Sequence, residues 1–152
     1  MPLQGADDVK KMLAKNKKES NDNIRKVYFH GLTNIIEATP VDEGRARNNW
    51  FLTVGAPFSL AGRNADKSGG GSESSAASMP AWVLNKKIYF TNNLPYIGVL
   101  EYGGYPSPVK KGTYIKAKGA YEIKSIGGYS KQAPVGWVRR TLVAIKNQLG
   151  EL

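Results

Sequence analysis

The sequence contains no cysteine, and its 152 residues include a single histidine. Disulfides, thiolate metal sites and cysteine nucleophiles are therefore excluded. His30 alone makes no convincing metal site, and we expect it to be structural or exposed. No apolar run approaches the roughly 18–20 residues that span a bilayer, and the first residues lack the apolar region of a signal peptide. We therefore expect a soluble chain with no membrane partner.

Patterns typical of catalysis are also missing. One histidine leaves a single possible base for a serine nucleophile, and no Gly-x-Ser-x-Gly occurs. The stretch "GGGS" is not a phosphate loop, because no Lys-Ser/Thr follows it. The acids Glu37, Asp42, Glu43 and Glu101 could be imagined as glycosidase carboxylates, but four of twelve acids form no pattern. We predict that the protein is not an enzyme and needs no cofactor or metal.

Positive charge is in excess and is unevenly distributed. The formal net charge is +10. Residues 1–30 carry seven Lys/Arg and four acids, residues 31–80 carry four and five, and residues 81–152 carry eleven and three. The basic part could attract nucleic acid or an acidic protein surface. It could equally be a solvated surface, since no nucleic-acid recognition motif accompanies the charge.

Helical spacing dominates both ends of the chain. Between Asp7 and Ala38 it predicts either one long helix or two helices that meet near residues 20–23, where weak helix formers gather. A second amphipathic helix is predicted near the end of the chain, with Pro134 near its start and Gly150 past its end. Its apolar positions are Val135, Val138, Leu142, Ile145 and Leu149. Trp137 lies slightly off this stripe, so an interface role and core packing stay equally open.

The stretch "TPVDEGRARNNWF", residues 39–51, predicts a joint between helix and strand. Pro40 disfavours the helical conformation of the residue before it and should end the first helix. Asp42 is expected to cap a short turn, and Gly44 supplies permissive backbone there. Trp50 begins an alternating pattern that predicts a strand and a core position. Arg45 and Arg47 could grip phosphate, serve a neighbouring subunit, or form local ion pairs.

Residues 55–80 are rich in glycine, serine and alanine, and they predict a long mobile loop. Its less polar members Phe58, Leu60 and Met79 could dock on a neighbouring protein. A tolerated surface insertion with no partner is the other interpretation.

The remaining segments predict short elements. Residues 82–93 favour a strand. Pro95 begins a helical pattern that Gly103–Gly104 ends, and a basic, Gly- and Pro-punctuated segment of loops or irregular strands follows. Together these features predict one α+β domain over residues 1–152, in which the two terminal helices pack on a small, mainly antiparallel sheet.

Three segments resemble one known family in its order. "TPVDEGRARNNW" resembles the "TPVDTGRLRNSW" element of bacteriophage tail-completion and neck proteins, a family that includes minor tail protein Z-like components. "IYFTNNLPYIGVLEYGG" is similar to its "N-x-x-Y-A-x-x-x-E-x-G" element, and "QAPVGWVRRTL" to its "P-x-G-F-V-R-x-A-L" helix start. Glu43 and Ala46 stand where the family prefers Thr and Leu.

The resemblance implies a structural virion protein at the head–tail junction, assembled in the bacterial host cytoplasm. It implies a homo-oligomeric ring of six subunits that contacts the neighbouring connector and tail proteins. The residues that we expect at subunit or partner contacts are Arg45, Arg47, Phe58, Leu60, Met79, Trp137, Arg139 and Arg140. The alternative function is a basic nucleic-acid-binding protein that contacts the phage genome at the head–tail channel.

Overall fold

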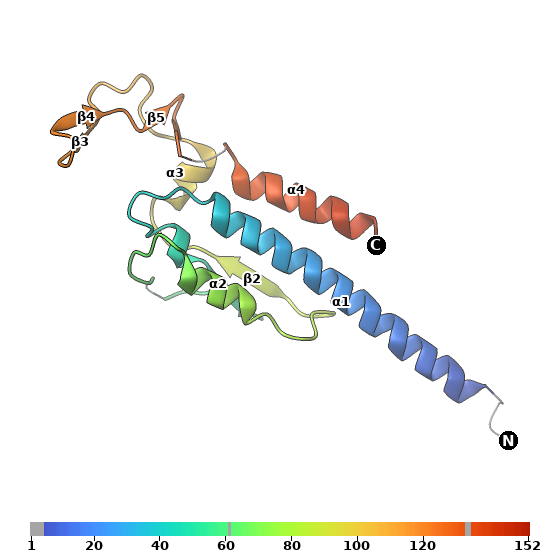
Figure 1. Ribbon diagram of the computed structural model, residues 1–152. Coiled ribbons are helices and arrows are strands. Elements are labelled where there is room, and N and C mark those ends of the chain that lie inside the picture. Colours follow the sequence, from blue (N-terminus) through green and yellow to red (C-terminus); the bar gives the residue numbers. More distant parts are fainter. Residues whose placement is uncertain (1–4, 61, 133–134) are drawn as a thin grey trace.

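The computed structural model describes residues 5–60, 62–132 and 135–152. A long helix α1 (Ala6–Ala38) runs from one end of the molecule into its middle, and helix α4 (Trp137–Gly150) lies along its second half (Figure 1). Between them come the 3-10 helix η1 (Arg47–Asn49) and the short helices α2 (Gly70–Ala77) and α3 (Ile97–Tyr102).

The strands form three antiparallel pairs within the part of the chain that the structure describes. Strand β1 (Phe51–Val54) pairs with β2 (Ile88–Thr91), and Leu52 lies opposite Phe90. The other pairs are β3 (Thr113–Ile115) with β4 (Ala120–Glu122), and β5 (Ser125–Ile126) with β6 (Tyr129–Ser130). The predicted α+β class is confirmed, with its strands divided among three small sheets rather than gathered in one.

Helix α1 is a single helix, so the two-helix alternative is wrong. The polar residues that suggested a bend make tertiary contacts instead. Asn21 is buried, and its side chain accepts a hydrogen bond from the backbone of Val83 at 2.7 Å and donates to Ala81 O at 2.8 Å. Arg25 donates to Pro80 O at 3.0 Å. These bonds satisfy backbone groups of an irregular segment, which is why polar residues occupy this face of the helix.

The end of α1 agrees with the prediction. Thr39 takes an extended conformation, with φ −62° and ψ 130°, as the following Pro40 requires. Its hydroxyl donates to Ile35 O at 2.6 Å and accepts from Trp50 Nε1 at 2.9 Å. Trp50 is buried and stacks on the Phe90 ring, with the centroids 5.1 Å apart. The predicted core role of Trp50 is therefore confirmed.

The joint itself differs from the prediction in one respect. Gly44 has φ +89°, and a Cβ there would overlap the backbone at Asp66, so glycine is required. Asp42, however, caps no turn. Its exposed carboxylate accepts from Lys124 Nζ at 3.0 Å, and η1 has Ala46 at its N-cap without a side-chain cap. The Asp42 carboxylate, which we predicted to cap a local turn, therefore pairs with Lys124, a residue distant in the chain.

Residues 55–80 are not the bare loop that their composition predicts, because α2 lies within them and packs on α1 and β1. The serines of α2 satisfy the edge of β1 that β2 leaves unpaired. Ser72 Oγ accepts from the backbone N–H of Trp50 at 2.9 Å, and Ser75 Oγ accepts from that of Leu52 at 2.8 Å. Small side chains allow this approach: a Cβ on Gly71 would lie 2.6 Å from Asn48 Oδ1.

Helix α4 packs closely on α1. A Cβ on Gly31 would overlap the Ile145 side chain, so glycine permits the contact. The predicted apolar stripe is only partly covered, because Val135 and Leu142 are exposed. Gly150 is the last residue of α4 rather than the residue after it. Pro134, at the predicted start of this helix, lies outside the described residues.

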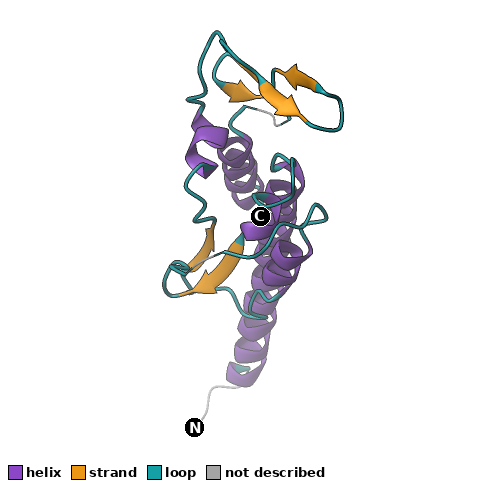
Figure 2. Ribbon diagram, turned by 90° about the vertical axis from the view of Figure 1, so that its left-hand side faces the viewer, coloured by secondary structure: helices purple, strands orange, loops and turns teal. Residues whose placement is uncertain are grey.

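Two parts project from the core. Residues 6–20 of α1, which we call the stem, lie beyond the rest of the chain and are almost entirely exposed (Figure 1). Residues 105–132, which we call the basic arm, carry the pairs β3–β4 and β5–β6 at the opposite end of the molecule (Figure 2). The core lies between them, around the buried side chains of Leu32, Ile35, Ile36, Ala46, Trp50, Leu52, Ala76, Met79, Val83, Leu94, Leu100 and Trp137.

The contact between α2 and β1 gives a first prediction. Replacing Ser72 by alanine leaves the buried N–H of Trp50 without an acceptor, which should lower the free energy of unfolding by about 1–3 kcal/mol. Ser74→Ala is the matched control, because Ser74 is an exposed serine of the same helix and gains the same intrinsic helix propensity. Urea denaturation followed by tryptophan fluorescence measures both. Equal stability of the two variants would contradict this role of α2.

Candidate functional site

Glu101 links α3 to the start of α4. It is buried, with 5% of its surface exposed, and its carboxylate accepts from the backbone N–H groups of Val138 and Arg139, both at 3.0 Å. The first N–H groups of a helix have no partner within it, and the helix dipole favours a negative charge there. Gly136 at the N-cap of α4 offers no side chain for this purpose. Glu101 therefore caps α4 from another helix.

Arg139 completes this link. Its Nε donates to Glu101 Oε1 and its Nη2 to Glu101 O, both at 3.0 Å, and its guanidinium lies 4.6 Å from the ring centroid of Tyr102. The hydrogen bond to Glu101 raises the pKa of the arginine. We call Glu101 and Arg139 the clamp. Arg139, which we predicted at a partner contact, thus makes these contacts within its own chain.

Two residues near Arg139 in helix α4 have different roles. Trp137 is 2% exposed and belongs to the core, so the open question of its role is answered in favour of packing. Arg140 is exposed and borders a shallow hollow over α1, together with Glu37 and Thr141. Of the two, only Arg140 remains accessible to a partner.

The buried asparagines before Trp50 hold the segment that precedes α2. Asn48 donates to Asn64 O at 2.9 Å and accepts from Gly71 N at 2.7 Å. Asn49 accepts from Arg63 N at 2.6 Å and donates to Arg63 O at 3.0 Å. The Arg63 guanidinium in turn donates hydrogen bonds to the carbonyl groups of Asn48 and Trp50, both at 3.0 Å. "RNNW" is therefore a structural element that closes the chain on itself.

Arg47 also serves the fold. Its guanidinium donates to Glu37 O at 2.7 Å and to Thr39 O and Lys67 O, both at 3.3 Å. It therefore satisfies carbonyl groups at the end of α1, where a cation is favoured by the helix dipole. Among the described residues Arg47 forms no ion pair with the adjacent acids, and its hydrogen bonds are to backbone carbonyl groups.

The predicted docking residues of segment 55–80 separate into three cases. Met79 is buried in the core, so its predicted partner contact is wrong. Phe58 is half-buried and stacks on Phe51 with the ring centroids 3.9 Å apart, while Arg63 lies over the same Phe51 ring. Leu60 is 70% exposed. Only Leu60 presents an apolar side chain largely to solvent.

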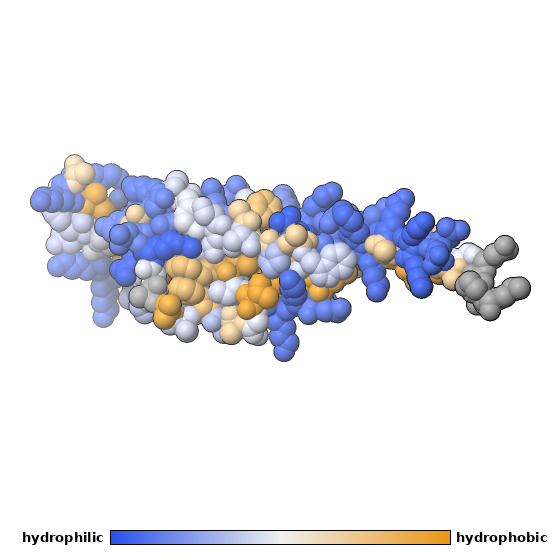
Figure 3. All heavy atoms as spheres, turned by 90° about the horizontal axis from the view of Figure 1, so that it is seen from below, coloured by the Kyte–Doolittle hydropathy of each residue, from blue (hydrophilic) through white to orange (hydrophobic). Residues whose placement is uncertain are grey.

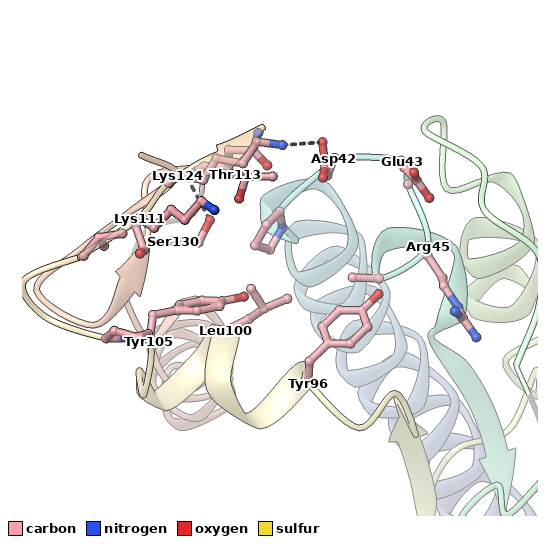
Figure 4. Close-up of a pocket in the computed structure, with 18 residues that line it drawn as sticks. Asp42, Glu43, Arg45, Tyr96, Leu100, Tyr105, Lys111, Thr113, Lys124 and Ser130 are labelled. Carbon is pink, nitrogen blue, oxygen red and sulfur yellow. Dashed lines mark hydrogen bonds and ion pairs between the residues drawn. The ribbon is translucent and has the colours of Figure 1, made fainter. Parts of the chain in front are cut away.

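A pocket of about 550 Å³ lies between the joint, α3 and the basic arm (Figure 4). Leu100, Tyr96 and Tyr105 supply its apolar and aromatic wall, and the ion pair of Lys124 with Asp42 crosses its edge. Burial raises the pKa of the Tyr96 phenol, and the nearby Arg45 opposes this shift. The charged groups on the rim are Asp42, Glu43, Arg45, Lys111 and Lys124.

The pocket combines both signs of charge with two phenol groups, Tyr96 and Tyr105. Over residues 5–60, 62–132 and 135–152, no group of three or more His, Cys, Asp or Glu side chains could hold a metal ion. Over the same ranges, no helix is both long and apolar enough to cross a membrane.

Sequence reasoning missed the structural roles of Glu101, Asn48 and Ser72. Glu101 is an acid in a short, otherwise apolar helix, and a buried acid there needs a partner of opposite charge or a helix start. That pattern could have drawn attention to it. The partners of Asn48 and Ser72 lie 16–23 residues away, so no local spacing indicates them.

Comparison of the chain with protein-family models, with curated proteins and with solved structures found no match. The resemblance to phage tail-completion proteins therefore rests on the three sequence elements alone.

The clamp generates the second prediction. Glu101→Gln removes the charge and replaces one acceptor oxygen by a donor, so one N–H of α4 loses its partner. We expect a loss of about 1–3 kcal/mol in the free energy of unfolding. Glu122→Gln is the control, because its exposed pair with Lys118 contributes at most about 1 kcal/mol. Thermal melts monitored by circular dichroism measure both, and an unchanged melting point for Glu101→Gln would contradict the clamp.

Proposed function

We propose that this protein is a structural virion protein of a tailed bacteriophage, which completes the tail end or joins the tail to the head connector as a homo-oligomeric ring. The observation that carries the proposal is that the three elements of the family resemblance contact one another. Asn92 of the second donates to Ala46 O of the first at 2.9 Å, and Glu101 of the second binds Arg139 of the third. Elements distant in the sequence thus form one structural unit.

The stem supports assembly with other copies. Val9, Met12 and Leu13 are 51%, 57% and 54% exposed on a helix that the rest of the described chain does not cover there. The stem is the uncovered end of α1, and exposed apolar side chains favour a covered position. A neighbouring copy that covers these side chains would supply the burial that the single chain lacks.

Further exposed residues are suited to partner contacts. We call the described chain outside the stem and the basic arm the body. Three residues that were predicted at interfaces remain exposed on different parts of the body: Arg45, Leu60 and Arg140. Apolar side chains also gather on the face of the body that Figure 3 shows, while the stem and the arm are mainly hydrophilic. Contacts on separate faces are those of a heterologous interface, which closes into a ring when the rotation between copies permits it.

The proposal leads to a prediction about the stem. Serine at Val9, Met12 and Leu13 removes apolar surface without touching the core, so the variant should stay folded and lose the ring. Light scattering after size exclusion and negative-stain images measure the assembly, and circular dichroism measures the fold. The parent protein should give rings, for which the resemblance implies six copies.

The matched control carries serine at Lys11, Ala14 and Lys18, which lie on the opposite face of the stem by helical spacing. It should assemble like the parent. A monomeric parent at high concentration would contradict self-assembly, and equal loss of rings in both variants would show that the apolar face has no special part in it.

A further inference from the structure

We propose that the basic arm, residues 105–132, binds the phosphate backbone of duplex DNA. This inference does not depend on the ring. It assigns the DNA contact, which the sequence analysis gave only as an alternative, to one defined part of the chain. That part can be altered without altering the stem.

The charge of the arm is strongly one-sided. It contains six lysines and one acid. Lys118 already pairs with that acid, Glu122, and Lys124 pairs with Asp42 of the joint. The lysines of the arm that form no ion pair within the described residues are Lys110, Lys111, Lys116 and Lys131.

The arm is poorly covered by the rest of the chain. Every residue of β4 is exposed, as are Thr113 and Tyr114 of β3. Two backbone N–H groups donating to Gly128 O, from Gly104 at 2.9 Å and Tyr105 at 3.1 Å, join the base of the arm to the end of α3. A lone two-stranded hairpin is marginally stable in water. A polyanion that neutralises the arm would remove the repulsion between its lysines and so favour its folded form.

The arm has a chemical reason to bind nucleic acid rather than another copy. Residues 31–80, which form much of the body, carry four basic and five acidic residues, and the whole chain has a net charge of +10. A second copy therefore offers no strongly acidic surface. Nucleic acid carries a regular array of phosphates, and lysines that bind it release condensed counterions.

The side chains favour contact with the backbone over readout of bases. All six basic residues of the arm are lysines, which act as point charges and lack the forked geometry with which arginine recognises guanine. Tyr114 and Tyr121 pack against each other with the ring centroids 5.3 Å apart, and Lys111 lies over Tyr121. Both rings remain more than half exposed, so the choice of duplex rests on the lysines: duplex DNA presents the denser array of phosphates and releases more counterions per contact than a single strand does.

The test is a salt titration of DNA binding by the full chain, measured by fluorescence anisotropy with a labelled duplex of arbitrary sequence. We expect a non-specific dissociation constant on the order of 10⁻⁴–10⁻⁶ M at physiological salt, with a steep salt dependence. Replacing Lys110, Lys111, Lys116 and Lys131 by glutamine should reduce the salt slope by up to about 3.6, at about 0.9 per lost phosphate contact.

The control replaces Lys10, Lys11, Lys15 and Lys17 of the stem by glutamine, which lowers the net charge by the same amount. It should keep most of the salt slope. Equal loss in both variants would overturn the proposal, because binding would then follow net charge alone. No binding by the parent would overturn it too, as would protection of the arm from hydrogen exchange on self-assembly without DNA. A preference for a labelled single strand of equal length would overturn the assignment to duplex DNA.

Discussion

The hydrogen bond between Trp50 Nε1 and Thr39 Oγ, 2.9 Å long, is the interaction on which the body of this protein depends. It closes the joint at the end of α1 and brings the start of β1 against that helix. Arg47 reinforces it from the side by donating to Glu37 O and Thr39 O. With the direction of β1 set in this way, α2 can satisfy one edge of the strand while β2 pairs with the other. The contact that sets the direction of β1 is thus polar and lies inside an apolar core.

The sequence predicted the features that local chemistry determines. Pro40 ended a helix, Trp50 entered the core, and Gly44 occupied a position that only glycine fits well. Prediction from the sequence failed where the hydrogen-bonding or ion-pair partner of a side chain is distant in the chain. The serines of α2 look like a linker in composition, but they satisfy the N–H groups of Trp50 and Leu52 from 22 and 23 residues away. Asp42 likewise meets Lys124 rather than a local turn, and Glu101 caps a helix that begins far downstream.

The division between core and projections organises the functional interpretation. Buried asparagine and serine side chains, together with half-buried arginines, hold the middle of the chain together by hydrogen bonds to backbone groups. The stem and the basic arm show the opposite pattern, because most of their side chains are accessible to solvent. Both carry lysines, and the stem adds the exposed apolar side chains of Val9, Met12 and Leu13.

The clamp has a consequence for how the protein can change over evolutionary time. Glu101 and Arg139 hold together the two points at which the chain leaves the body and returns to it, so the segment between them begins and ends at a fixed base. The entropy of closing such a loop rises slowly with its length, by only about 0.6 kcal/mol for each doubling. Insertions, deletions and exchanges in the arm should therefore be tolerated while the clamp is kept. The body then acts as a constant platform on which a variable segment can be adapted to a different partner.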